Sequence, residues 1–247
     1  VRLAESCLKS GSRVFRMDMR GCGAAHSLSR NLPHAGRSDD VISALDLIAE
    51  KSREGPMLAV GVSLGAGQLL RAVGRIGRGD SNLPNWFERL ERIAVVAPPL
   101  DLRRCSANLQ RFWLRPYNFY FIRALLGSVP PGVHQRADFR KAIQQRRPRT
   151  LWELDDRITA PLSGFDGAGD YYEQASACRV VSFNPVPTLV VAAADDPIVP
   201  VGCFADDPGL WPQSTQLVIT STGGHMGFLD RRRRCWIDEV VASWFST

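Results

Sequence analysis

Residues 57–67 read Met-Leu-Ala-Val-Gly-Val-Ser-Leu-Gly-Ala-Gly, and they decide how the rest of the sequence is interpreted. An apolar run, Met57–Val60, leads into Gly-Val-Ser-Leu-Gly, and a stretch typical of a helix follows from Ala66. Strand, sharp turn and helix in this order are the context of the G-x-S-x-G pattern, in which a serine sits on a strained turn with its hydroxyl exposed. The pattern therefore predicts a nucleophilic serine at Ser63.

The residues beside this serine suit the same interpretation. Gly61 and Gly65 predict close strand–helix packing, because a Cβ at either position is expected to crowd the turn. The backbone N–H of Leu64 is expected to serve as one oxyanion donor. A purely structural turn is the alternative, since glycine and serine are common in turns. An acid and a histidine placed after later strands favour catalysis over that alternative.

The histidine follows by elimination. The chain has four histidines, and only His225 comes after the last predicted strand, residues 215–220, in a glycine-rich turn. It is the predicted general base. The acid is Asp195 or Asp196, which follow the predicted strand at 187–193. We prefer Asp196, because a proline and a short apolar pair follow it, and Asp195 is the alternative. The other three histidines lie before the serine turn or in the middle of the chain: His26, His34 and His134.

Apolar strands alternate with helical segments, which predicts an α/β fold with a mostly parallel sheet covered by helices on both faces. Strands are also expected at 13–18 and 93–97, and a loop at 74–85. From about residue 101 to 180 the alternation stops, and aromatic and basic residues become frequent. We therefore expect a first core part at 1–100, a helical cap insertion at 101–180 and a second core part at 181–247.

Composition narrows the class of protein. The chain has 247 residues, 45% of them hydrophobic and 23% charged, which fits one globular domain with an insertion. No apolar run reaches the roughly 18 residues of a membrane span, and no signal peptide is recognised, so a cytoplasmic location is predicted.

Neither a metal nor a cofactor is predicted. The six cysteines are scattered and form no C-x-x-C pair. Gly21-Cys22-Gly23 lacks the third glycine of a dinucleotide fingerprint. Three acidic pairs lack histidines at ligand spacing and are interpreted as caps and turns: Asp39-Asp40, Asp155-Asp156 and Asp206-Asp207.

The net charge of +6 comes largely from arginines, clustered at 140–149 and in the run 231–234. A solvated helix face is the preferred interpretation of these clusters. Nucleic-acid binding ranks last, because no motif for it is present. A basic surface facing anionic lipid head groups, and hence peripheral membrane contact, is a further possibility.

Together these segments resemble the α/β-hydrolase superfamily, within it the AB hydrolase 4 branch of esterases and lipases, which includes the YheT-like proteins and the abhydrolase-domain lipases. The resemblance spans nearly the whole chain and is carried by an Arg-Gly turn, a His-x-Gly…Asp helix start, the serine turn, a cap segment with Tyr171-Tyr172, and the acid and base turns: residues 18–23, 33–40, 61–65, 165–176, 195–197 and 223–225.

The resemblance implies a serine hydrolase without cofactor that cleaves carboxylic esters, acyl esters or acylglycerols, through an acyl-enzyme. The same three residues support thioester, amide or lactone hydrolysis. A non-catalytic binding protein of the same fold is the competing hypothesis. Acyl-chain length, physiological substrate and oligomeric state stay open.

The family places three strands and a His-Gly oxyanion motif before its first helix, and this sequence begins at Val1. The resemblance therefore implies that N-terminal strands and the second oxyanion donor lie outside the sequence. We expect a fragment of a longer hydrolase that is weakly active or unstable alone, and an inactive truncated hydrolase belongs among the alternatives.

Overall fold

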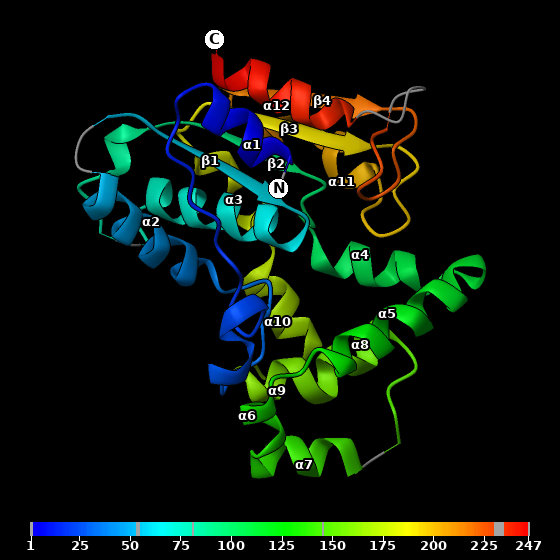
Figure 1. Ribbon diagram of the computed structural model, residues 1–247. Coiled ribbons are helices and arrows are strands. Elements are labelled where there is room, and N and C mark those ends of the chain that lie inside the picture. The colour runs from blue at the N-terminus through cyan, green and yellow to red at the C-terminus, as the bar shows by residue number, and fades with distance from the viewer. Residues whose placement is uncertain (1, 53–54, 81, 145, 230–234, 247) are drawn as a thin grey trace.

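Four parallel strands form the sheet of the computed structural model, which describes residues 2–246 except 53–54, 81, 145 and 230–234 (Figure 1). They follow one another in the order β1-β2-β3-β4. The register sets Val62 opposite Val96 and Val96 opposite Val191, so the carboxyl ends of the strands share one edge. The strands are Met57–Val62 (β1), Leu90–Val96 (β2), Thr188–Ala193 (β3) and Thr215–Thr220 (β4).

Helices cover both faces of this sheet. In Figure 1, α1 and α12 lie side by side over one face, α2 and α3 lie on the other, and the helices between β2 and β3 gather beyond the sheet. The helices are Arg2–Lys9 (α1), Ser38–Ser52 (α2), Leu64–Arg78 (α3), Leu102–Leu109 (α4), Arg115–Gly127 (α5), Pro131–His134 (α6), Ala137–Gln144 (α7), Leu151–Leu154 (α8), Ala160–Leu162 (α9), Ala168–Ala175 (α10), Gly202–Ala205 (α11) and Trp236–Ser246 (α12).

The central strands are buried on both sides. Val95 and its neighbours at every second position pack into the core beneath α2 and α3, whereas Val96 packs with Trp236 and Val241 on the α12 side. Side chains alternate between the two faces of a strand, and here both faces are covered by apolar residues. The strands are therefore continuous apolar runs in the sequence. The sequence-based expectation of a parallel sheet covered on both faces is confirmed.

The predicted strand at 13–18 is wrong. These residues form no ladder with any described strand. Arg13 donates a hydrogen bond to the Lys51 carbonyl oxygen at the end of α2, and its guanidinium lies 4.8 Å from the Phe15 ring centroid. Apolar residues at 14, 15 and 17 suggested a strand, but a strand also needs a neighbouring ladder for its backbone hydrogen bonds.

The predicted loop at 74–85 begins too early, because α3 continues to Arg78. Gly74 and Gly77 lie inside the helix, where it crosses the chain after α10 at close range. A Cβ on Gly74 would lie 2.4 Å from the Val180 carbonyl oxygen, and one on Gly77 would lie 2.0 Å from that of Phe183. Gly79, with φ of 85°, then ends the helix.

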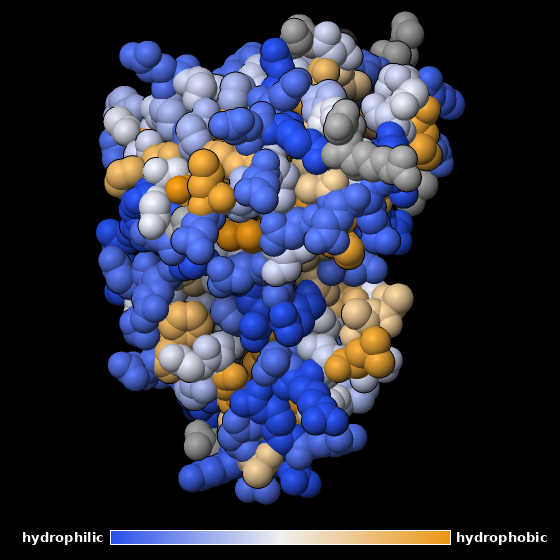
Figure 2. Space-filling model, turned by 90° about the vertical axis from the view of Figure 1, so that its left-hand side faces the viewer, coloured by the Kyte–Doolittle hydropathy of each residue, from blue (hydrophilic) through white to orange (hydrophobic). Residues whose placement is uncertain are grey.

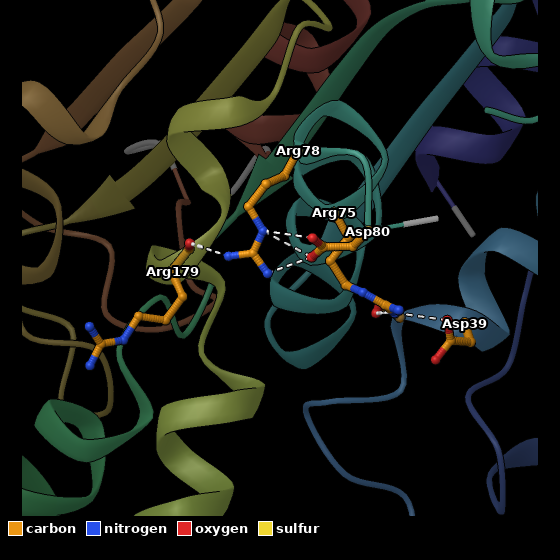
Figure 3. Close-up of polar contacts among 6 residues, drawn as sticks. Asp39, Arg75, Arg78, Asp80 and Arg179 are labelled. Atoms are coloured by element: carbon orange, nitrogen blue, oxygen red, sulfur yellow. Dashed lines mark hydrogen bonds and ion pairs between the residues drawn. The ribbon is translucent and has the colours of Figure 1, made fainter. Parts of the chain in front are cut away.

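Arginines fix the C-terminal end of α3 to two other segments (Figure 3). Arg75 Nη1 lies 2.8 Å from Asp39 Oδ1 at the start of α2. Arg78 pairs with Asp80 and donates to the Arg179 carbonyl oxygen. Cations at the last turn of a helix also interact favourably with its dipole. The helix that follows the serine turn is therefore held at both of its ends.

Hydrophilic and hydrophobic side chains are unevenly distributed on the surface. Hydrophilic side chains dominate the face drawn in Figure 2, where hydrophobic ones form separate patches. Within the described part of the chain, no helix is long and apolar enough to cross a bilayer. The arginine run at 231–234 lies outside the described residues.

Gly74→Ala should destabilise the protein by about 2 kcal/mol or more, although alanine is the better helix former, because the new methyl group would meet backbone atoms. Gly127→Ala is the matched control, since a Cβ at the end of α5 meets nothing within 4 Å. It should leave stability unchanged or raise it by up to about 1 kcal/mol. Urea unfolding midpoints measure both variants, and equal effects would contradict this account of α3.

Candidate active site

Ser63 occupies a strained turn between β1 and α3. Its φ is 49° and its ψ −122°, outside the regions that non-glycine residues normally adopt. Its N–H donates to the Val96 carbonyl oxygen over 2.8 Å, which fixes the turn to β2. A Cβ at Gly61 would lie 2.6 Å from Ala66 Cα, as expected for this turn. The expectation for Gly65 is wrong, because a Cβ there would meet no atom within 4 Å.

The structure brings Ser63, His225 and Asp196 into one hydrogen-bonded row. Ser63 Oγ lies 2.6 Å from His225 Nε2, and His225 Nδ1 lies 2.8 Å from Asp196 Oδ2. A carboxylate only accepts, so Nδ1 carries the proton and Nε2 is free to accept the serine hydroxyl. The His225 and Asp196 side chains are only 14% and 2% exposed. An imidazole held in this way can accept a proton from the serine.

The two adjacent aspartates, left open as alternatives, have different partners. Asp196 Oδ1 accepts the N–H groups of Ile198 (2.7 Å) and Val199 (3.0 Å), which leaves Oδ2 facing His225. Asp195 does not contact the imidazole. Its Oδ1 accepts the Gly224 N–H over 2.7 Å and so holds the backbone of the histidine turn. The geometry therefore favours Asp196 as the partner of the histidine.

The turn that carries the histidine depends on glycine. Gly223 has a φ of 158°, and a Cβ there would lie 2.9 Å from the Phe228 ring. Gly224 has a φ of 55°, in the left-handed region that glycine favours. On the other side of the serine, Leu64 is the first residue of α3, so its N–H has no intrahelical acceptor and is available to a ligand.

A cavity of about 330 Å³ opens beside these residues, and Ser63, Leu64 and His225 belong to its wall. Most of the remaining wall is apolar and comes from α5, α8 and the segments near them. Size and lining are typical of a small-molecule site. The apolar wall residues include Leu32, Phe121, Leu125, Val129, Leu154 and Ile158.

His34, which was not predicted as a catalytic residue, also lies in the cavity wall. Its Nδ1 accepts the Gly36 N–H over 3.2 Å, so Nε2 carries the proton. Burial, helped by the Arg37 charge, lowers the pKa of His34 to about 4. The ring meets the Phe165 and Tyr171 rings edge to face. A neutral imidazole is therefore built into the wall beside the serine, and the only sequence signal for it was the His-x-Gly…Asp pattern at 33–40.

The interpretation of Asp155-Asp156 as a simple cap and turn is wrong for the first residue. Asp156 does accept the N–H of Ala168 at the start of α10. Asp155, however, is buried in the cavity wall and accepts the Tyr172 hydroxyl over 2.7 Å. Burial raises the pKa of Asp155 to about 6, and hydrogen bonds from Tyr172 and Thr159 lower it in part. The Tyr171-Tyr172 pair was the one available sequence signal.

No group of three or more histidine, cysteine, aspartate and glutamate side chains is arranged to hold a metal ion within the described ranges. The six cysteines are free thiols.

Asp155→Asn should change how stability depends on pH. The folded-state pKa lies above the reference value of 3.8, so ionisation of Asp155 costs the wild type stability as the pH rises through 6. Asparagine keeps an acceptor for Tyr172 and cannot ionise. The unfolding free energy of the variant relative to wild type should therefore rise by on the order of 3 kcal/mol between about pH 4 and pH 7. Denaturant titrations at both pH values measure this, and a constant offset would contradict it.

Comparison with known proteins places this geometry in a family. The family model for the alpha/beta hydrolase fold matches residues 1–232. The Escherichia coli protein YheT is 27% identical over 99% of this chain and 71% of its own length. Medium-chain fatty acid ethyl ester synthase/esterase 2 of Saccharomyces cerevisiae is 28% identical over 99% of this chain and 57% of its own. Phospholipase ABHD3 of Mus musculus is 28% identical over 89% and 52%. The last two relatives are thus matched over little more than half their length.

The solved structure of Paleococcus ferrophilus monoacylglycerol lipase has the same fold, with a TM-score of 0.58 at 16% identity, and covers 98% of this chain and 86% of that one. The resemblance to the branch of YheT and the abhydrolase-domain proteins, first drawn from short motifs, is confirmed by these relatives. The chain belongs to the α/β hydrolase fold family, and its distant relatives are esterases and lipases.

Proposed function

We propose that this chain is a serine hydrolase that cleaves carboxylic esters through an acyl-enzyme. The observation that carries the proposal is the row Ser63–His225–Asp196, with hydrogen bonds of 2.6 and 2.8 Å, whose serine and histidine lie in the wall of an apolar cavity. Each member follows a different strand, at the shared carboxyl edge where open α/β sheets bind ligands.

In the first half of the reaction, Ser63 Oγ attacks the ester carbonyl carbon while His225 Nε2 takes the hydroxyl proton. Asp196 stabilises the imidazolium that forms. The Leu64 N–H donates to the developing oxyanion. The intermediate collapses when the carbon–oxygen bond to the alcohol breaks and His225 gives its proton to the leaving oxygen. Ser63 is then acylated.

In the second half, water replaces the alcohol. His225 takes a proton from water, the hydroxide attacks the acyl carbon, and the carboxylic acid leaves as the proton returns to Ser63 Oγ. The Leu64 N–H is one of the two oxyanion donors that this mechanism needs. The second donor stays a prediction, and full activity is proposed for the whole protein.

The lining of the cavity supports acyl esters, including acylglycerols, as the substrate class. Apolar side chains on α5 and α8 can cover an acyl chain, which buries apolar surface away from water. The names of three relatives also refer to acyl esters: a fatty acid ethyl ester synthase/esterase, a phospholipase and a monoacylglycerol lipase. Thioester hydrolysis uses the same residues and is the substrate class nearest to this one.

Ser63→Ala should lower kcat/KM for a p-nitrophenyl ester by about a thousandfold or more, because the nucleophile is removed. Asp196→Asn should cost a similar factor, since the amide can donate to the imidazole and favour the wrong tautomer. Asp195→Asn is the matched control and should change the rate by less than about tenfold, because its amide oxygen can still accept the Gly224 N–H.

Steady-state kinetics of these folded variants measure the three rates. A large loss in Asp195→Asn with little loss in Asp196→Asn would overturn the assignment of the acid. Activity that persists in Ser63→Ala would overturn the proposed mechanism. A folded wild type without activity on any acyl length would point to a binding protein.

Leu125→Trp should shift the preferred acyl length downward. Leu125 lies on α5 in the cavity wall and is only partly buried, so a larger ring can project into the cavity. The ratio of kcat/KM for a long acyl ester to that for an acetyl ester should fall by about tenfold or more. Leu83→Trp, at a loop position that is 63% exposed, is the control and should leave the ratio unchanged. An equal ratio in both variants would contradict acyl binding along α5.

A further inference from the structure

A stripe of aromatic side chains faces solvent on the short helix Phe112–Leu114 and on α5. Phe112, Trp113, Phe119 and Tyr120 are 75, 71, 61 and 69% exposed, and they recur at helical spacing on one side. The buried residues of α5 are Asn118 and Ile122. Surface helices of globular proteins normally turn their polar side outward. Here the outward side is aromatic, and these four residues are called the aromatic stripe.

Arginines accompany the stripe. Arg111, Arg115 and Arg123 hold their guanidinium groups over aromatic rings, at 5.9 Å from Trp113, 5.3 Å from Phe112 and 5.8 Å from Phe119. Cation–π contacts of this kind leave the charge in water and free to meet an anion. None of the three arginines forms an ion pair with any other described residue.

The stripe lies in a segment of the sequence that is rich in positive charge. Residues 102–149 contain eleven arginines and lysines and one acidic residue, Asp138, so this segment carries a formal charge of +10. The whole chain carries +6, and the remainder is therefore negative. Arg104 and Arg146 pair with Asp206 and Glu153, which lie outside this segment. The positive charge that remains attracts a surface of opposite sign.

A groove of about 700 Å³ runs beside the stripe. Apolar side chains of α5 form one part of its wall, and arginines of α5 and of the segment after α7 form the other. The apolar residues are Phe119, Ile122 and Leu126, and the arginines include Arg123, Arg147 and Arg149. A wall of this kind offers an apolar surface and phosphate-binding guanidinium groups next to each other.

The stripe lies where the molecule projects. In Figure 1, α4 and α5 meet at a corner that extends beyond the other helices, and residues 112–114 form the tip. Two further aromatic residues of α5, Tyr117 and Phe121, stack on each other and line the cavity that contains Ser63. One helix therefore carries both the exposed stripe and part of the cavity wall.

We propose that the aromatic stripe and its arginines form a surface that adsorbs to anionic lipid bilayers. Phe and Trp side chains enter the head-group region, where amphipathic rings are favoured, and the arginines meet lipid phosphates. A single strand of nucleic acid, which stacks bases on aromatic rings along a basic groove, and a second copy of this chain are the other occupants that the test separates. Adsorption does not depend on the proposed esterase activity.

The test is co-sedimentation with vesicles of phosphatidylcholine alone and of phosphatidylcholine mixed with phosphatidylglycerol. The wild type should bind the anionic vesicles and should bind the neutral ones at least about tenfold more weakly, with affinity that falls as salt is added. The variant with Phe112, Trp113, Phe119 and Tyr120 all changed to Ser should lose binding. The control changes Leu47 and Leu83, which are exposed elsewhere, to Ser and should bind as the wild type does.

A charge variant decides the question if the aromatic variant fails to fold. Changing Arg111, Arg115 and Arg123 to Gln should weaken binding to anionic vesicles by about 100-fold. The matched Lys variant keeps the charges and should retain most of the binding. Thermal melting by circular dichroism verifies that each variant is folded.

Three results would overturn the proposal. The first is wild-type binding that is absent, or equal for the two vesicle types. The second is a folded Gln variant that still binds like the wild type. The third is a folded aromatic variant that binds vesicles as the wild type does but no longer binds polyuridylate, or no longer self-associates in light scattering.

Discussion

The backbone of Ser63 is the constraint on which the rest of the site depends. A non-glycine residue at φ of 49° is costly, and it persists because the surrounding structure over-determines it. Gly61 permits α3 to start directly against β1, the Ser63 N–H is held by β2, and the far end of α3 is fixed by arginines and by glycine contacts with the chain near Val180. The turn is therefore held by contacts from two strands, from α3 and from the chain near Val180.

Hydrogen bonds also fix the two other members of the row, Asp196 and His225. Asp196 is buried and receives two backbone N–H groups on the oxygen that does not face His225. Asp195 fixes the turn that carries the histidine. The result is a donor–acceptor chain with little freedom, and a preorganised site of this kind does not have to reorganise during a reaction. The helices between β2 and β3 then place an apolar wall against it, and one of them, α5, also presents aromatic residues to solvent.

Sequence patterns could predict those parts of the molecule that local chemistry determines. The serine turn, the positions of β1 to β4 and the covered parallel sheet follow from residue spacing and apolar runs. The segment at 13–18 was mistaken for a strand because pairing depends on a neighbour that a local pattern does not reveal. The predicted end of α3 was wrong because glycine in a sequence can mark a loop or a close contact. Gly74 and Gly77 lie inside the helix and allow another part of the chain to pass close to it. His34 and Asp155 lie in the cavity wall because of contacts with residues that are distant in the sequence or on other helices, which a local pattern does not reveal. The sequence could not decide between Asp195 and Asp196, whereas the structure shows which carboxylate oxygen faces His225.

Covalent labelling by a fluorophosphonate probe tests the central claim most directly. The probe phosphonylates an activated serine oxygen with loss of fluoride, so it reports nucleophilicity without requiring knowledge of the substrate or the acyl length. The account predicts a single adduct on the peptide that contains Ser63, formed quickly in the wild type, slowly in Asp196→Asn and not at all in Ser63→Ala. A folded protein that remains unlabelled, or an adduct on a different residue, would contradict it.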